Sequence, residues 1–122
     1  MKMEKILIKV TDFTEYPDVR YRDQDIDSGE EYYYDVINPN FKLALSENKI
    51  LVVDLDNTAG YASSFLDEAF GNLVYDFDFV LIKKHLDIIS TQEPDWKNII
   101  LEEILDIWKK KKDTDKPRKE TK

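Results

Sequence analysis

The segment from Ile50 to Phe70 constrains the fold more than any other part of the chain. It opens with a nearly continuous apolar run, Ile50 to Leu55, which is typical of a central strand covered on both faces. A short polar loop then leads to Ser63 and Ser64, which precede apolar residues at helical spacing. Because serine is a preferred capping residue, the pair predicts a helix that begins there and ends near Tyr75.

Further periodic segments extend this pattern into an α/β fold. Residues 3–10 alternate apolar and polar side chains, which predicts a strand with one covered face. Ser28 is followed by acidic residues and predicts a helix start, whereas Pro39 predicts a kink in that helix or two short helices. Residues 86–89 predict another strand, and an amphipathic helix follows Pro94. We therefore expect a mixed, partly parallel sheet packed against helices.

Length and composition indicate one small domain. The chain has 122 residues, of which 42% are hydrophobic, and this suits a single core in residues 1–108 followed by a basic tail in residues 109–122. It contains no cysteine and no apolar run long enough to span a membrane. We expect a cytoplasmic protein with no membrane partner and no cofactor.

The net charge of −8 divides unevenly along the chain. The tail holds eight Lys or Arg against three acids, a net of +5, so the preceding residues carry −13. Such a body repels nucleic acid and acidic membranes. It is either a solvated acidic surface or an inhibitor that mimics nucleic acid and binds a basic site on another protein.

Residues 11–27 lack periodicity and predict a long loop that carries two cations and an aromatic residue, Arg20, Tyr21 and Arg22. These residues either pair with the nearby acids Asp18, Asp23 and Asp25 or fold over the predicted Ser63 helix end and bind an anionic group.

Two further groups carry structural expectations. The consecutive tyrosines 32–34 cannot all face inward from one helix, so at least one should be exposed and available for a protein contact. His85 has no second histidine or cysteine to form a triad or metal site, and we expect it to be partly exposed.

Two acids at the end of the predicted central strand suggest a weaker alternative. Asp54, Asp56 and Thr58 match the Asp-x-Asp-x-Thr motif and so resemble phosphotransfer enzymes of the haloacid dehalogenase type. Paired carboxylates at a strand end can hold Mg²⁺ through oxygen ligands. The chain is too short for the remaining motifs of those enzymes, and we expect a protein that is not an enzyme.

The run DLDNTAGYASSFL, residues 54–66, resembles the signature of STAS domains, the fold of anti-anti-sigma factors. The longer pattern NTAGYASSFLDEAFGNLV, with RYRDQDIDSGEEYYYDVINP before it and HLDIIS after it, is more closely similar to the STAS-like domain family of unknown function. This resemblance covers about Ile8 to Ile89. Where the anti-anti-sigma factors have Asp before the serine pair and Gly after it, this chain has Ala62 and Phe65.

The resemblance implies a regulatory protein-interaction module. It places Ser63, the first serine of the pair, at the position phosphorylated by a partner kinase of the GHKL ATPase type, with Ser64 beside it. A serine there can also be a structural helix cap, and both interpretations remain open. Asp56, Asn57 and Tyr61, from the loop before the pair, join Arg20–Arg22 as candidate contacts to a protein partner or an anion.

Overall fold

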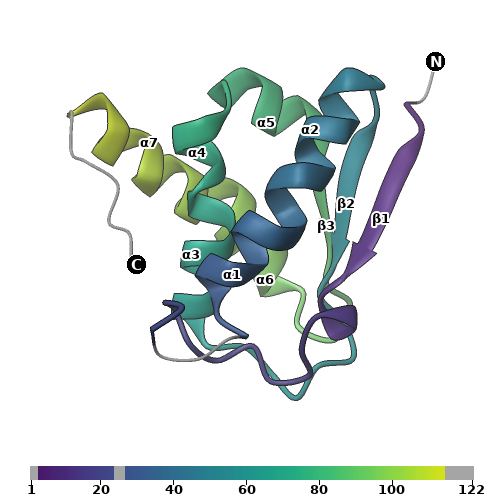
Figure 1. Ribbon diagram of the computed structural model, residues 1–122, viewed down its shortest axis with the longest axis vertical. Helices are drawn as coiled ribbons and strands as arrows, with labels where there is room; N and C mark the ends of the chain where they lie inside the picture. Colours follow the sequence, from purple (N-terminus) through teal and green to yellow (C-terminus); the bar gives the residue numbers. More distant parts are fainter. Residues whose placement is uncertain (1–2, 24–26, 115–122) are drawn as a thin grey trace.

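The computed structural model describes residues 3–23 and 27–114 and has an α/β fold (Figure 1). A parallel sheet lies on one side, and the helices lie together against one of its faces. The sheet contains β1 (Lys5–Lys9), β2 (Ile50–Asp54) and β3 (Leu86–Ile89) in the order β1-β2-β3. The predicted α/β class is confirmed, and β2 is the central strand as expected.

Both strand pairings are parallel, so within the described residues the sheet is parallel throughout. The strand order advances in one direction, and right-handed crossovers then place both connecting helical segments on the same face. Ile6, Leu51 and Ile88 are among the side chains that point toward those helices. Val52, on the opposite face, is only 3% exposed although the helices lie on the other side.

The first crossover consists of a short 3₁₀ helix, the long loop and one continuous helical stretch. A short 3₁₀ helix, η1 (Val10–Asp12), follows β1, and α1 (Gly29–Tyr32), the π-helix η2 (Tyr33–Ile37) and α2 (Asn38–Ser46) follow the loop. The Asn38 N–H donates to the carbonyl of Tyr33, five residues back, and Pro39 begins the next turn. The wider π turn therefore accommodates a proline that has no N–H to donate.

The tyrosines of this stretch correct one expectation. Tyr32 and Tyr33 are fully buried, and Tyr34 is partly buried, so none of the three is exposed. Tyr34 packs edge-on against Tyr33, with ring centroids 5.0 Å apart, and the Arg22 guanidinium lies 4.7 Å from its ring centroid. A contact from the long loop covers the ring that the helix alone would have left outside.

The second crossover contains α3 (Ser63–Gly71), α4 (Leu73–Asp76) and α5 (Phe79–His85). The predicted helix from Ser63 to Tyr75 is therefore interrupted at Asn72. The buried Asn72 amide donates to the Glu68 carbonyl and the Glu68 carboxylate, both at 2.8 Å. His85 is buried, contrary to expectation, and its Nδ1 lies 2.8 Å from the Lys49 carbonyl oxygen, which gives the buried ring a hydrogen-bond partner.

The C-terminal stretch comprises α6 (Asp95–Asn98), the π-helix η3 (Ile99–Ile104) and α7 (Leu105–Asp113). It packs against α3 and α4. A Cβ added at Gly71 would lie 2.0 Å from the Trp108 ring, so glycine makes room for the indole. Ile107 is apolar but 50% exposed, and α7 continues into the predicted tail as far as Asp113.

Within the described part of the chain, no helix has both the length and the apolar character needed to cross a membrane.

Phe70→Ala should lower the free energy of unfolding by about 3–5 kcal/mol, the usual penalty for removing a core aromatic ring. Phe70 is fully buried in the cluster between α3 and the sheet. Chemical denaturation measures the change. Val80→Ala, at a position that is 70% exposed, is the control and should change stability by less than about 0.5 kcal/mol. A loss below about 1 kcal/mol for Phe70→Ala would contradict its place in the core.

Candidate functional site

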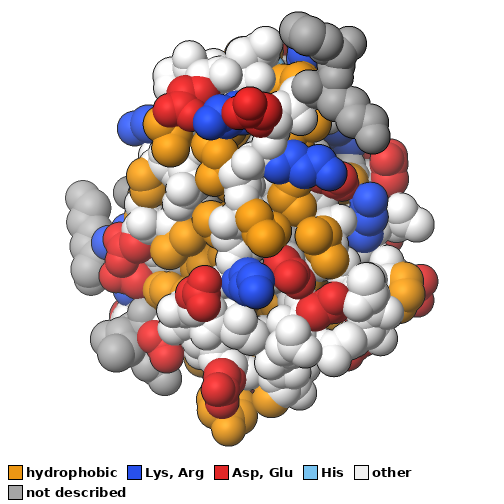
Figure 2. All heavy atoms as spheres, turned by 90° about the vertical axis from the view of Figure 1, so that its right-hand side faces the viewer, with side chains coloured by type: hydrophobic (Ala, Val, Ile, Leu, Met, Phe, Trp, Pro, Cys, Tyr) orange, Lys and Arg blue, Asp and Glu red, His pale blue; other side chains and the backbone are white. Residues whose placement is uncertain are grey.

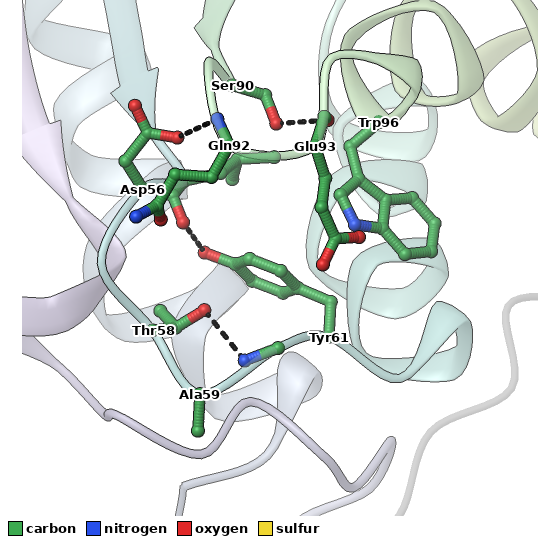
Figure 3. A pocket seen from close by; sticks show the side chains of 10 residues that line it. Asp56, Thr58, Ala59, Tyr61, Ser90, Gln92, Glu93 and Trp96 are labelled. Carbon is green, nitrogen blue, oxygen red and sulfur yellow. Dashed lines mark hydrogen bonds between the residues drawn. The ribbon is translucent and has the colours of Figure 1, made fainter.

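The residues singled out from the sequence lie in two neighbouring regions. The first is a cleft of about 230 Å³ where β2 and β3 end, shown in Figure 3 and called here the strand-end cleft. It is lined by Leu55, Asp56, Thr58, Ala59, Gly60, Tyr61, Ser90, Gln92, Glu93 and Trp96. Open α/β sheets commonly bind ligands at the carboxyl ends of parallel strands.

Asp56 holds the two strand-end loops together. Its carboxylate accepts hydrogen bonds from the Thr91 N–H at 2.9 Å, the Thr91 hydroxyl at 2.5 Å and the Gln92 N–H at 3.1 Å. The Thr91 hydroxyl, helped by the two backbone donors, keeps the pKa of Asp56 below its ordinary value. The negative charge of the Asp56 carboxylate is therefore stabilised by donors of the protein itself.

Tyr61 closes one side of the strand-end cleft (Figure 3). Its hydroxyl donates to the Leu55 carbonyl at 2.7 Å, and its ring packs edge-on toward Trp96. Burial raises the pKa of the Tyr61 phenol, so the group stays protonated at neutral pH. The Trp96 indole N–H is buried and has no hydrogen-bond partner within the described ranges.

Asn57 lies at the tip of the same loop and is exposed. Its φ of 71° is a left-handed conformation, which asparagine adopts more readily than most residues. Its N–H donates to the Gln92 side-chain oxygen at 2.6 Å. Asn57 thus reinforces the link between the loops, and its own side chain faces the outside.

Asp54 and Asp56, the acids at the end of β2, accept backbone hydrogen bonds within the described part of the chain. Asp54 accepts the Asp56 N–H at 2.9 Å, and the Thr58 hydroxyl accepts the Gly60 N–H at 3.3 Å. Among residues 3–23 and 27–114 there is no group of three or more His, Cys, Asp or Glu side chains that could hold a metal ion. The three residues that match the Asp-x-Asp-x-Thr motif shape a loop.

The second region is the N-terminus of α3, and here the sequence prediction is wrong. Ala62 is the N-cap residue, with extended backbone angles, and no side chain caps the helix. Ser63 and Ser64 are already the first two helical residues. A capping side chain must extend back from a non-helical residue before the first turn, so neither hydroxyl can serve. Ser63 is exposed, and the Ser64 hydroxyl lies 3.5 Å from the Asp18 carbonyl oxygen.

The long loop lies against this helix end. The Ala62 N–H donates to the Pro17 carbonyl at 3.0 Å, and the Ala59 N–H donates to the Glu15 carbonyl at 2.8 Å. Between these two loop segments lies a depression of about 400 Å³, called here the loop depression. Tyr16, which lines it, is 69% exposed. It is lined by Tyr16, Pro17, Asp18, Ala59, Gly60, Tyr61 and Ala62. It ends one residue before Ser63.

Arg20 binds carboxylates of α3. Its guanidinium lies 2.5 Å from Asp67 and 3.2 Å from Glu68, so the expected pairing with Asp18 or Asp23 is wrong, and Asp25 is outside the described residues. Burial raises the pKa of the Glu68 carboxyl, against the opposing hydrogen bonds from Asn72 and Arg20. Arg20 therefore folds over α3, but it neutralises the helix's own acids.

Arg22 and Tyr21 complete the loop. Arg22 lies 3.3 Å from Glu31 and 3.9 Å from Glu30, and its backbone N–H donates to Glu30 at 3.0 Å. The Tyr21 ring centroid is 5.9 Å from the Arg20 guanidinium carbon. The two arginines thus contact different helices, α3 and α1, and join both to the loop.

Several residues of these regions were not predicted from the sequence. Gln92 and Trp96 line the strand-end cleft from the chain after β3, and Thr91 bonds to Asp56 beside them. Asp67 pairs with Arg20 across 47 residues. The only available signal was the polar turn Ser90–Gln92 directly after a strand, because loops that follow neighbouring parallel strands meet at one edge of the sheet.

Comparison with known proteins gives one family. The family model described as a STAS-like domain of unknown function matches residues 35–96, about half of the chain. The matched range includes α2, β2, the loop before α3, the second crossover and β3. This match confirms the resemblance noted in the sequence. No curated protein and no solved structure matches the chain significantly.

The two serines at helix starts should differ in their contribution to stability. The Ser28 hydroxyl is buried and accepts the Glu31 N–H at 3.0 Å, whereas Ser63 caps nothing. Ser28→Ala should therefore cost about 1 kcal/mol, and Ser63→Ala less than about 0.5 kcal/mol. Urea denaturation of both variants compares them. Equal losses would show that Ser63 does cap α3.

Proposed function

This chain belongs to the family of STAS-like domains of unknown function, and from that premise we propose that it is a non-enzymatic protein-interaction module controlled by phosphorylation of Ser63. The partner that we propose is an ATPase or kinase of the GHKL type, as the resemblance to anti-anti-sigma factors implies. The contact surface is the loop depression together with the first turn of α3. The strand-end cleft adjoins this surface through Tyr61.

The observation that carries the proposal is the state of the Ser63 side chain. It is exposed, and no hydrogen bond joins its hydroxyl to the rest of the described chain. Because Ala62 takes the N-cap position, the hydroxyl has no structural task that a phosphate would disturb. A kinase can therefore reach it without unfolding the helix.

Local electrostatics also favours a phosphate at this position. The first turn of α3 presents backbone N–H groups and the positive end of the helix dipole, which stabilise an anion. Anti-anti-sigma factors have Asp at the position of Ala62. Because alanine is uncharged, it would not repel a phosphate on Ser63 as an aspartate would. Asp67, the nearest acid along the same helix face, is paired with Arg20 and accepts the Trp108 N–H at 2.9 Å.

The surrounding surface suits a protein partner better than a small substrate. Tyr16 projects beside the loop depression, and exposed aromatic rings are common anchors of protein interfaces. Asn57 and Ala59 are exposed at the tip of the facing loop. The carboxylate of Asp56, in contrast, is committed to backbone and hydroxyl donors, and the Tyr61 phenol is held protonated.

The experiment compares Ser63→Glu and Ser63→Ala against a partner captured with the full chain. We expect Ser63→Glu to weaken binding at least tenfold, a change of about 1.4 kcal/mol, because a carboxylate partly mimics the phosphate. Ser63→Ala should bind as the wild type does and resist phosphorylation. Calorimetric titration measures the affinities, and mass spectrometry after incubation with the partner and ATP measures phosphate incorporation.

Ser46→Glu is the matched control. Ser46 is an exposed helical serine at the end of α2, so the same charge change there should leave partner binding unaltered. Equal affinities for wild type and Ser63→Glu, with no phosphate on Ser63, would refute the proposal. A DNA-binding partner from which DNA displaces the chain would instead support the acidic-mimic interpretation.

A further inference from the structure

The outer edge of β1 carries backbone groups that no strand of the described chain pairs with. β1 pairs with β2 on one side, and the register is continuous from Lys5 to Lys9. The Ile50 N–H donates to the Glu4 carbonyl at 2.9 Å, so the alternation of a parallel ladder directs the backbone of Ile6 and Ile8 toward β2. The N–H and C=O groups of Lys5, Leu7 and Lys9 therefore point away from the sheet.

A cleft runs beside this edge. It has a volume of about 210 Å³ and lies where β1 and η1 meet the first crossover helix; we call it the edge cleft. Leu7, Ile8 and Lys9 form its strand side, Phe13, Tyr32 and Val36 form an apolar wall opposite, and Asp12 of η1 is the one acid in its lining. A strand added to β1 would direct alternate side chains toward this wall, as in other complexes formed by strand addition.

The side chains on the exposed face of β1 alternate between lysine and leucine. Lys5 and Lys9 are exposed on either side of Leu7, which is itself 52% exposed. Neither lysine has an ion pair with any residue in the described ranges, although most of the chain is acidic. Figure 2 views the molecule from the right-hand side of Figure 1, the side on which β1 lies, and hydrophobic side chains extend across the middle of that view with charged groups among them.

We propose that an extended acidic segment of a protein partner binds the edge of β1 as a fourth strand. Its backbone would bond to the unpaired groups of Lys5, Leu7 and Lys9. Its residue opposite Leu7 is apolar, and the residues two positions away on either side are Asp or Glu, opposite the two lysines. The residues between them face the edge cleft and are apolar.

Charge repulsion argues against two other occupants of this edge, a second copy of the chain and the chain's own tail. A second copy paired antiparallel about Leu7 would oppose Lys5 to Lys9, and a parallel copy in register would oppose each lysine to itself; like charges directly opposite destabilise a strand pair. The basic residues 109–122 of the chain's own tail would meet the same repulsion. An acidic strand from another protein removes it. The proposal does not depend on Ser63 or on a GHKL-type partner.

Selection from a displayed library of random ten-residue peptides on the immobilised full chain tests the proposal. We expect enrichment of peptides with Asp or Glu at two positions four residues apart and an apolar residue midway. In titrations of ¹⁵N-labelled protein, an enriched peptide should shift and protect the amides of Lys5, Leu7 and Lys9. The same peptide with Lys at its acidic positions should bind at least tenfold more weakly.

Variants of the chain locate the contact. Lys5→Glu with Lys9→Glu should weaken the enriched peptide at least tenfold, whereas the matched change Lys42→Glu with Lys84→Glu, at exposed lysines of α2 and α5, should not. Leu7→Pro removes an outward N–H that β2 does not use, so it should abolish binding while the β1–β2 pairing persists. Leu7→Val, which keeps that N–H, should retain binding.

Three results would overturn the proposal. The first is selection without acidic enrichment, and the second is a peptide whose amide shifts map away from β1. The third is a dimer, detected by analytical ultracentrifugation and dissolved by Leu7→Pro, which would make a second copy the occupant. Circular dichroism and thermal unfolding of each variant separate lost binding from a lost fold.

Discussion

The rest of the structure depends on the close approach of α1 to α3. A Cβ at Gly29 would lie 2.3 Å from the Phe65 carbonyl oxygen, so the first turns of the two helices are in direct contact and only glycine fits between them. The contact places both crossovers side by side on one face of the sheet. It also fixes the long loop, because the N–H groups of Gly29 and Glu30 donate to the carbonyls of Val19 and Arg20, each at 2.9 Å.

Several polar and charged side chains in this molecule connect segments that are distant in the sequence. Asp56 joins the loops after β2 and β3, and Arg20 joins the long loop to α3. Partly buried pairs of this kind satisfy groups that would otherwise lose their hydration, and they position neighbouring backbone. At Ser63 and along the outer edge of β1, by contrast, the described residues leave side-chain or backbone groups exposed, and the proposed contacts rest on these groups.

Local patterns were sufficient for the framework of the fold and for part of the candidate site. The apolar run of β2, the Ser28 cap and the β3 segment were predicted because each depends on side chains within a few residues. The motif around Ser63 led to the correct family, which the match over residues 35–96 confirms. Asp56 and Tyr61, which belong to the loop before Ser63, both line the strand-end cleft.

The sequence by itself determined the central strand, the helix start at Ser28, the α/β class and the family. Only the tertiary structure decided that Ala62 occupies the N-cap position of α3, that Arg20 pairs with Asp67 and that, among the described strands, β1 has an unpaired edge beside a cleft. A helix start, an ion pair and a sheet edge each depend on which segments, distant in the sequence, lie beside them in the folded chain. Periodicity records only which face of a segment is apolar, so it cannot specify the neighbour that the face will meet.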